Sequence, residues 1–89
     1  MEFGICVPHY GKPVDIASTL GVARSAEELG FASVWVTDHL FVPRTMEIIY
    51  RDNMLEPLAL LSHLAAVVSR VRLGTSVLIT AYYTPIMLA

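Results

Sequence analysis

The chain has 89 residues, of which 55% are hydrophobic and 16% are charged, whereas an average soluble domain is roughly 25% charged. Six basic and eight acidic residues give a net charge of −2, and the scattered arginines offer no basic patch for nucleic-acid phosphates. A single cysteine, Cys6, excludes an internal disulfide framework and indicates a reducing compartment. A chain with this many apolar residues needs a large core, and 89 residues are too few to enclose one. The chain is therefore either a small, very apolar domain or a piece of a larger protein.

Metal and membrane motifs are absent from the sequence. His9, His39 and His63 have no cysteine or carboxylate at metal-ligand spacing. The N-terminus has no basic region before its apolar residues, as a secretory signal would. The uncharged tail over residues 73–89 is interrupted by Gly, Ser, Thr and Pro and is shorter than the ~20 apolar residues of a spanning helix. We therefore expect a cytoplasmic protein without metal, membrane or nucleic-acid partners.

The chain opens with a predicted strand. Residues 3–7 form an apolar run that Pro8 closes, and residues 10–13 supply turn-forming types. A short run of this kind is typical of a strand buried on both faces. Cys6 falls within it, which predicts an inert, buried thiol.

A helix and a second strand follow. Asp15 is the expected N-cap of a helix over residues 16–29, and Gly30 supplies the left-handed stop. The apolar side of this helix is predicted to hold Ile16, Leu20, Ala23 and residues 26–29. Residues 32–37 are rich in β-forming types and predict the second strand, with Trp35 in the core rather than against a cofactor.

The second half repeats this alternation. A loop over residues 40–55 leads to Glu56-Pro57, where proline at the first position predicts a helix that runs to residue 70. Residues 71–79 form the third predicted strand, and Thr84-Pro85 is typical of another helix start. Apolar residues recur at helical spacing in the second helix, at Leu58, Leu61, Leu64, Ala65 and Val68, and His63 between them is expected at the surface.

The order of these elements predicts an α/β fold. Apolar strands joined by helices suit a parallel sheet that is covered on both faces. Three strands would leave that sheet open, with unpaired edges and with one face that lacks its partners. We therefore expect residues 1–89 to be one partial domain with β-α-β-α-β order that ends at the start of a third helix.

Three segments resemble the luciferase-like monooxygenase superfamily. Residues 26–39, which end in Asp38-His39, resemble the end of its first helix and its second strand. Residues 56–75 resemble its second helix and third strand, and Phe3-Gly4-Ile5 resembles its first strand. The resemblance implies the N-terminal portion of a (β/α)8 TIM barrel, a fold of about 250 residues, apparently truncated after three strands and two helices.

The resemblance also implies an oxidoreductase activity. Members of the superfamily use reduced FMN for monooxygenation or a deazaflavin coenzyme for hydride transfer. The implied partners are a small-molecule substrate and a separate flavin reductase, and we expect a homo-oligomer. The cofactor would lie at the C-terminal mouth of the barrel, and the Ser76-Val77 pair favours deazaflavin over FMN.

Asp38 and His39 are the predicted catalytic pair and belong to the predicted cofactor site. An imidazole exchanges a proton near neutral pH, and a neighbouring carboxylate can hold its tautomer. Because adjacent residues of a strand point to opposite faces, contact between the two side chains requires the strand to have ended. The alternative is that Asp38 caps a turn and His39 only lines the loop.

Thr75, Ser76 and Val77 complete the predicted cofactor site. In the family this segment forms a bulge with a cis peptide bond against the flavin, which makes Ser76–Val77 the candidate bond. Without the resemblance, these are ordinary strand residues.

His9 and Tyr10 follow the first strand and are the predicted substrate residues, bordering the flavin ring or the substrate. A solvated turn is the alternative.

The loop after the second strand is unusually apolar, which suits a substrate lid or packing against further parts of a barrel. Its apolar residues are Met46, Ile48, Ile49, Tyr50 and Met54.

The sequence leaves a second function open. In this alternative the chain is a non-catalytic truncated fragment that self-associates or packs with the rest of the barrel. Phosphate sites of such barrels usually lie in loops after the later strands, so a fragment with three strands is expected to bind flavin weakly.

Overall fold

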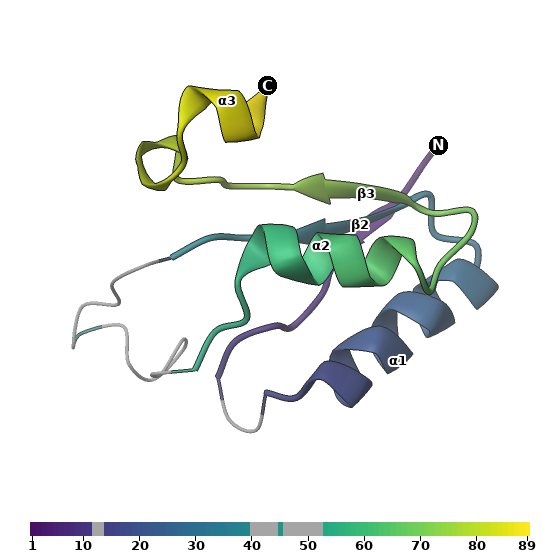
Figure 1. Ribbon diagram of the computed structural model, residues 1–89. Helices are drawn as coiled ribbons and strands as arrows, with labels where there is room; N and C mark the ends of the chain where they lie inside the picture. Colours follow the sequence, from purple (N-terminus) through teal and green to yellow (C-terminus); the bar gives the residue numbers. More distant parts are fainter. Residues whose placement is uncertain (12–13, 40–44, 46–52) are drawn as a thin grey trace.

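The computed structural model describes residues 1–11, 14–39, 45 and 53–89. The elements are β1 (Gly4–Cys6), α1 (Ile16–Glu28), β2 (Ser33–Val36), α2 (Pro57–Ala65), β3 (Arg72–Thr75), a 3-10 turn η2 (Thr80–Tyr82) and α3 (Pro85–Leu88) (Figure 1). The predicted β-α-β-α-β order is therefore confirmed. Part of the predicted turn at residues 10–13 and most of the predicted loop at residues 40–55 lie outside the described residues, including Met46, Ile48, Ile49 and Tyr50.

The three described strands form one parallel sheet in the order β1-β2-β3. Val34 at the centre is the register partner of Ile5 in β1 and of Leu73 in β3. Right-handed crossovers between parallel strands in sequential order place the connecting helices on the same face, and Figure 1 shows α1 and α2 on one side of the sheet. All three strands consequently end at the same edge.

The hydrophobic core lies between the helices and one face of the sheet. Val34 and Val36 in β2 are 0% exposed. In α1 the buried residues are Thr19, Ala23 and Ala26. Both helices begin as predicted, because Asp15 accepts a hydrogen bond from the Ser18 amide at 2.8 Å and Glu56 caps α2.

The buried stripes of the helices differ in part from the expected ones. Leu60 is 3% exposed and Leu64 is 0% exposed, whereas the predicted Leu58 and Leu61 are only half-buried. At the two ends of α1, the predicted Ile16 is 42% exposed and the C-cap Leu29 is 77% exposed. His63 is exposed, as predicted.

In the described part of the chain the sheet is covered on one face (Figure 1), which agrees with the expectation that one face lacks its partners. Among the described elements, α1 and α2 cover one face, so side chains that alternate to the other face are accessible there. Trp35 is 39% exposed and the thiol of Cys6 is exposed, which corrects the prediction that both are buried.

Trp35 occupies this uncovered face by lying across its neighbours. A Cβ atom on Gly4 would lie 2.6 Å from Trp35 Nε1, and one on Gly74 would lie 2.7 Å from Trp35 Cζ3. The indole N–H donates to Ser33 Oγ at 2.8 Å. The ring therefore fits only because the facing positions in β1 and β3 are glycines.

The second helix ends at Ala65 rather than at residue 70. The amides of Ser69 and Val71 donate to Glu27 Oε1 at 2.8 and 3.2 Å, and the Arg70 amide donates to the same oxygen. Since these amides bind a carboxylate of α1, they are not available to carbonyls four residues back. The Arg70 side chain also donates to the Glu27 carbonyl at 2.7 Å, so the turn before β3 is fastened to α1.

The third strand ends at Thr75 rather than at residue 79. Its neighbour β2 ends at Val36, and the last ladder bond runs from the Ser76 amide to the Val36 carbonyl at 2.8 Å. Beyond that point β2 offers β3 no further strand partner, so the chain leaves the sheet.

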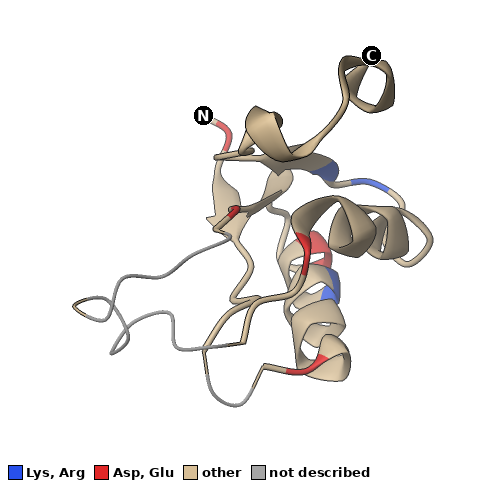
Figure 2. Ribbon diagram, turned by 60° about the vertical axis from the view of Figure 1, so that its left-hand side comes forward, with Lys and Arg blue, Asp and Glu red and all other residues tan. Residues whose placement is uncertain are grey.

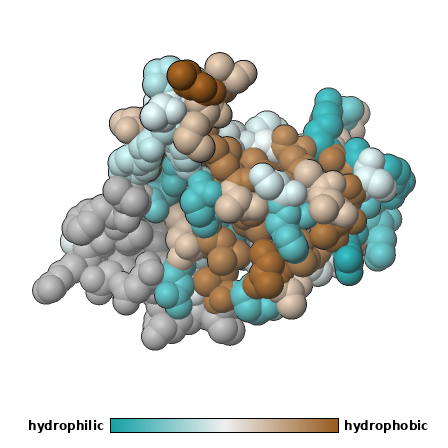
Figure 3. Space-filling view, in the orientation of Figure 1, coloured by the Kyte–Doolittle hydropathy of each residue, from teal (hydrophilic) through white to brown (hydrophobic). Residues whose placement is uncertain are grey.

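The charged residues of the described part are spread over the molecule rather than gathered in one patch (Figure 2). None of the helices in the described ranges is long and apolar enough to cross a membrane. The hydrophobic surface over α3 projects at one end of the molecule (Figure 3), where Ile86 is 89% and Met87 is 72% exposed.

The contacts of Glu27 predict a pH-dependent contribution to stability. The Arg70 amide, helped by the amides of Ser69 and Val71, outweighs partial desolvation and holds the pKa of Glu27 below its usual 4.5. A depressed folded-state pKa stabilises the fold above the unfolded value, and this stabilisation is lost as the pH falls through the folded value. Glu27→Gln should therefore lower the free energy of unfolding at neutral pH, and its difference from wild type should shrink below pH 4.5.

Urea unfolding over this pH range measures the effect. Glu28→Gln, at the exposed neighbouring position, is the matched control. A Glu27→Gln deficit that is independent of pH would contradict the carboxylate's role.

Adding a methyl group should have opposite effects at Gly74, which faces Trp35, and at Gly21, which faces open space. Gly74→Ala places a methyl group against the ring, and overpacking of this kind costs about 1–3 kcal/mol. Gly21→Ala in α1 meets nothing within 4 Å and should stabilise the fold by about 0.5–1 kcal/mol. Unfolding curves and the fluorescence of the single tryptophan report both effects. Unchanged fluorescence in Gly74→Ala would show that the ring does not lie over this glycine.

Candidate functional site

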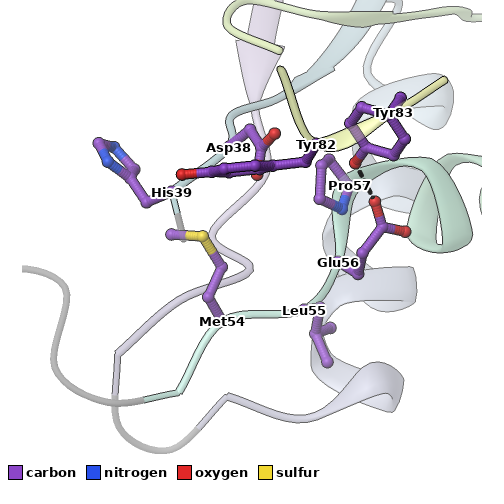
Figure 4. Close-up of a pocket in the computed structure, with 8 residues that line it drawn as sticks. All are labelled: Asp38, His39, Met54, Leu55, Glu56, Pro57, Tyr82 and Tyr83. Atoms are coloured by element: carbon purple, nitrogen blue, oxygen red, sulfur yellow. Dashed lines mark hydrogen bonds between the residues drawn. The ribbon is translucent and has the colours of Figure 1, made fainter. Parts of the chain in front are cut away.

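A cavity of about 430 Å³ lies at the edge where the strands end. Its described lining comes from the end of β2, the start of α2 and the segment after β3: Asp38, His39, Met54, Leu55, Glu56, Pro57, Tyr82 and Tyr83 (Figure 4). Ligand pockets are typically about 300–1,000 Å³, so the cavity is large enough for a small organic molecule.

Asp38 is the most enclosed acid of this cavity, at 6% exposure. Because β2 ends at Val36, Asp38 lies outside the strand and is free of its alternation. Its Oδ2 accepts the amide hydrogen of Ile79 at 2.9 Å. Asp38 therefore ties the chain after β3 to the end of β2.

His39 is half-buried and lines the same cavity. Figure 4 shows the side chains of Asp38 and His39 directed away from each other. The structure thus places the two predicted catalytic residues at one cavity, and the Asp38 carboxylate holds a backbone amide there. Their catalytic roles stay predictions.

Glu56 and Tyr83 form the hydrogen bond drawn in Figure 4. Tyr83 Oη donates to Glu56 Oε1 at 2.5 Å, while the Glu56 carboxylate also accepts the amides of Leu58 at 3.1 Å and Ala59 at 2.6 Å. Partial burial raises the pKa of Glu56, but the hydrogen bonds outweigh it and hold the pKa below its usual 4.5. The same bond raises the pKa of Tyr83 to about 12, so Tyr83 remains a donor at neutral pH.

The predicted cofactor residues at the end of β3 and directly after it are not in the described lining of this cavity. Thr75 is the half-buried end of the strand, and Val77 is 50% exposed. Ser76 donates to the Val36 carbonyl from its amide at 2.8 Å and from Oγ at 3.2 Å. The cis peptide bond expected between Ser76 and Val77 stays a prediction.

The predicted substrate residues lie in the segment after β1. His9 is 0% exposed, so the alternative of a solvated turn is wrong for it. Tyr10 is half-buried and forms an antiparallel bridge with Met54, and the Leu55 amide donates to the His9 carbonyl at 2.9 Å. This pairing places Met54 and Leu55 in the wall of the cavity.

Sequence reasoning assigned no site role to Glu56, Pro57 or Leu55. A usable signal existed for Glu56 and Pro57, because the helix that follows a parallel strand starts at the edge where the strand ends. No local pattern marked Leu55, since two irregular segments pair here without alternation. Among the described residues, no group of three or more His, Cys, Asp or Glu side chains could hold a metal ion.

The bond between Tyr83 and Glu56 predicts a local effect in Tyr83→Phe. The variant keeps the two amide bonds of Glu56, so α2 should be retained, but the segment that carries η2 loses a restraint. Hydrogen exchange should become faster at the amides of Tyr82 and Tyr83, which donate to Ile79 and Thr80, and remain unchanged in α2. Tyr82→Phe is the control.

Absorbance titration gives an independent readout of this bond. The tyrosine that titrates near pH 12 in wild type should be absent from Tyr83→Phe and should titrate closer to its ordinary value of 10.0 in Glu56→Gln. Equal exchange rates in Tyr83→Phe and Tyr82→Phe would contradict the restraint.

Comparison with known proteins identifies one family. The family model described as luciferase-like monooxygenase matches residues 1–89. No curated protein and no solved structure matches the chain. Since the family model spans all of the residues, the chain belongs to the luciferase-like monooxygenase family.

Proposed function

We propose that the cavity of Asp38 and His39 is part of the active site of a flavin-type oxidoreductase. The cofactor would be reduced FMN in a monooxygenation or deazaflavin in a hydride transfer. The family is one of oxidoreductases, and one observation carries the proposal to this site. Two residues selected from the sequence alone as the catalytic pair line one cavity at the carboxyl edge of the sheet, where α/β barrels hold their working residues.

The same reasoning supports a TIM barrel as the complete fold. The three described strands are parallel and in sequential order, and α1 and α2 lie on one face. In a barrel the other face points to the interior, where side chains from the remaining strands cover it. The exposure of Trp35 and Cys6 is consistent with such an interior face.

The described lining fits the ring of a flavin better than its phosphate. Met54, Pro57 and Tyr82 provide apolar and aromatic surface for a planar ring. Asp38 and Glu56 are acids, and the described lining contains no Lys or Arg. A phosphate would be repelled by these carboxylates, so we expect it to bind elsewhere in the complete site.

Six residues in and beside the cavity have defined tasks in this proposal. When bound, the cofactor supplies the transfer of electrons or hydride. His39 holds or releases a proton at a nitrogen of its imidazole ring, beside the reacting group. Asp38 orients this part of the site, because its carboxylate is fixed by the Ile79 amide. Tyr82, which is 49% exposed, shields one side of the cavity from water. Thr75, Ser76 and Val77 would contact the ring from the end of β3.

A second candidate function is supported by the surface of the chain. Trp35 on the uncovered face, together with Ile86 and Met87 of α3, exposes apolar side chains that pack against protein in most folds. The chain would then be a non-catalytic fragment that self-associates, or packs with the rest of a barrel. A homo-oligomer, a flavin reductase partner and a cytoplasmic location remain parts of the proposal, and the exposed thiol of Cys6 suits a reducing compartment.

Separate titrations with FMN and deazaflavin, followed by ring absorbance, distinguish the two candidates. One of the two should bind. Tyr82→Ala should weaken binding roughly two- to tenfold, since an aromatic pair contributes about 0.5–1.5 kcal/mol. His63→Ala, at an exposed position of α2, is the control. Binding of neither compound would favour the non-catalytic candidate.

His39→Ala tests the proton-transfer role. With the cofactor that the titrations select, the rate at which the bound ring changes its redox state should fall about 10²–10⁴-fold, as expected for loss of a general acid or base. Cofactor affinity should change much less, and His63→Ala should retain the wild-type rate. Full turnover in His39→Ala would overturn the assigned role.

A further inference from the structure

His9 is a buried titratable side chain for which the proposed proton transfer has no use. It follows β1 directly, it is 0% exposed, and its ring meets the ring of Tyr10 edge-on at 5.4 Å between centroids. A fully buried side chain has no contact with water, so both of its polar nitrogens need partners within the protein.

Both ring nitrogens contact backbone carbonyl oxygens. Nδ1 lies 3.0 Å from the carbonyl oxygen of Val7, and Nε2 lies 2.8 Å from the carbonyl oxygen of Thr37. A carbonyl oxygen only accepts hydrogen bonds, and a neutral imidazole carries one ring proton. The two contacts are therefore both hydrogen bonds only when both nitrogens carry a proton.

The two carbonyls belong to neighbouring strands at the place where their pairing stops. The Val7 amide donates to the Trp35 carbonyl at 2.9 Å, which continues the ladder between β1 and β2. Two residues further on, the next carbonyl of the same register is that of Thr37, and the His9 side chain contacts it. His9 thus extends the link between the strands beyond their last ladder bond.

Thr37 immediately precedes Asp38, whose carboxylate accepts the Ile79 amide at 2.9 Å. A continuous path therefore runs from the end of β1 through His9 to Thr37, Asp38 and the segment that carries Tyr82. We propose that His9, protonated on both ring nitrogens, is a positioning residue that fixes the backbone at Thr37 and so directs the Asp38 carboxylate. This rests on the proposed function only in counting Asp38 as part of the site.

The charge on such a ring needs a partner, because a buried cation is costly unless it is compensated. Asp38, at 6% exposure, is the acid next to the carbonyl that Nε2 contacts. In the proposal Asp38 supplies this compensation from its position beside Thr37, so His9 and Asp38 should respond to each other's replacement.

Side-chain ¹⁵N NMR of the wild-type protein at neutral pH tests the protonation state. Both nitrogens of His9 should resonate as protonated nitrogens, and exposed His63 provides the comparison in the same spectrum. One nitrogen of the unprotonated type would overturn the two-bond link.

Two variants test the positioning role. His9→Leu removes both donors, whereas His9→Gln retains a donor that can reach only one carbonyl. Exchange of the Ile79 amide should become about tenfold faster or more in His9→Leu, as expected when a hydrogen bond to a charged group is weakened, and His9→Gln should restore part of the loss. The carboxyl ¹³C signal of Asp38 should shift in both, while His63→Gln leaves both readouts at their wild-type values. Unchanged Ile79 exchange and Asp38 signal in His9→Leu would overturn the proposal.

Asp38→Asn provides the reciprocal measurement and keeps His9 intact, so it applies even where His9→Leu does not fold. In Asp38→Asn the ring signals of His9 should move towards those of a neutral imidazole. Unchanged ring signals would contradict the coupling between His9 and Asp38. These readouts need no cofactor. Failure of FMN and deazaflavin to bind, with His9 and Asp38 still coupled, would reject the proposed function and leave the positioning role supported.

Discussion

Parallel pairing of β1, β2 and β3 is the constraint on which the rest of the structure depends. It brings the carboxyl ends of all three strands to one edge, where segments far apart in the sequence must meet. The central strand ends at Val36, so the polar groups that follow it need partners other than a ladder. His9 takes the Thr37 carbonyl and Asp38 takes the Ile79 amide, and the candidate site forms where the ladder stops.

Four carboxylates satisfy backbone donors where regular structure ends. Asp15 and Glu56 accept amides at the starts of α1 and α2, Glu27 accepts the amides before β3, and Asp38 accepts one after it. These four described acids therefore act on the backbone. Asp38 combines this structural role with its proposed place in the site, so its replacement affects both, and His39 provides the cleaner test of chemistry.

Much of the element order could be predicted because its signals are local. Asp15, Gly30 and Glu56-Pro57 mark helix ends through interactions within a few residues, and all three are confirmed. The ends of α2 and β3 could not be predicted, because Glu27 and the end of β2 determine them from more than thirty residues away. Burial of Trp35 and Cys6 was mispredicted for a related reason, since an apolar strand does not reveal whether one face or both are covered.

The sequence by itself determined the α/β alternation, the family and the choice of Asp38 and His39, because caps, apolar runs and motifs are written in consecutive residues. Only the tertiary structure decided that these two residues share a cavity with Glu56, Tyr82 and Tyr83, and that His9 is a buried link between strands. The physical reason is that parallel strands are paired across long connections. Their register, and with it every contact at the carboxyl edge, is set by packing between segments that no local pattern relates.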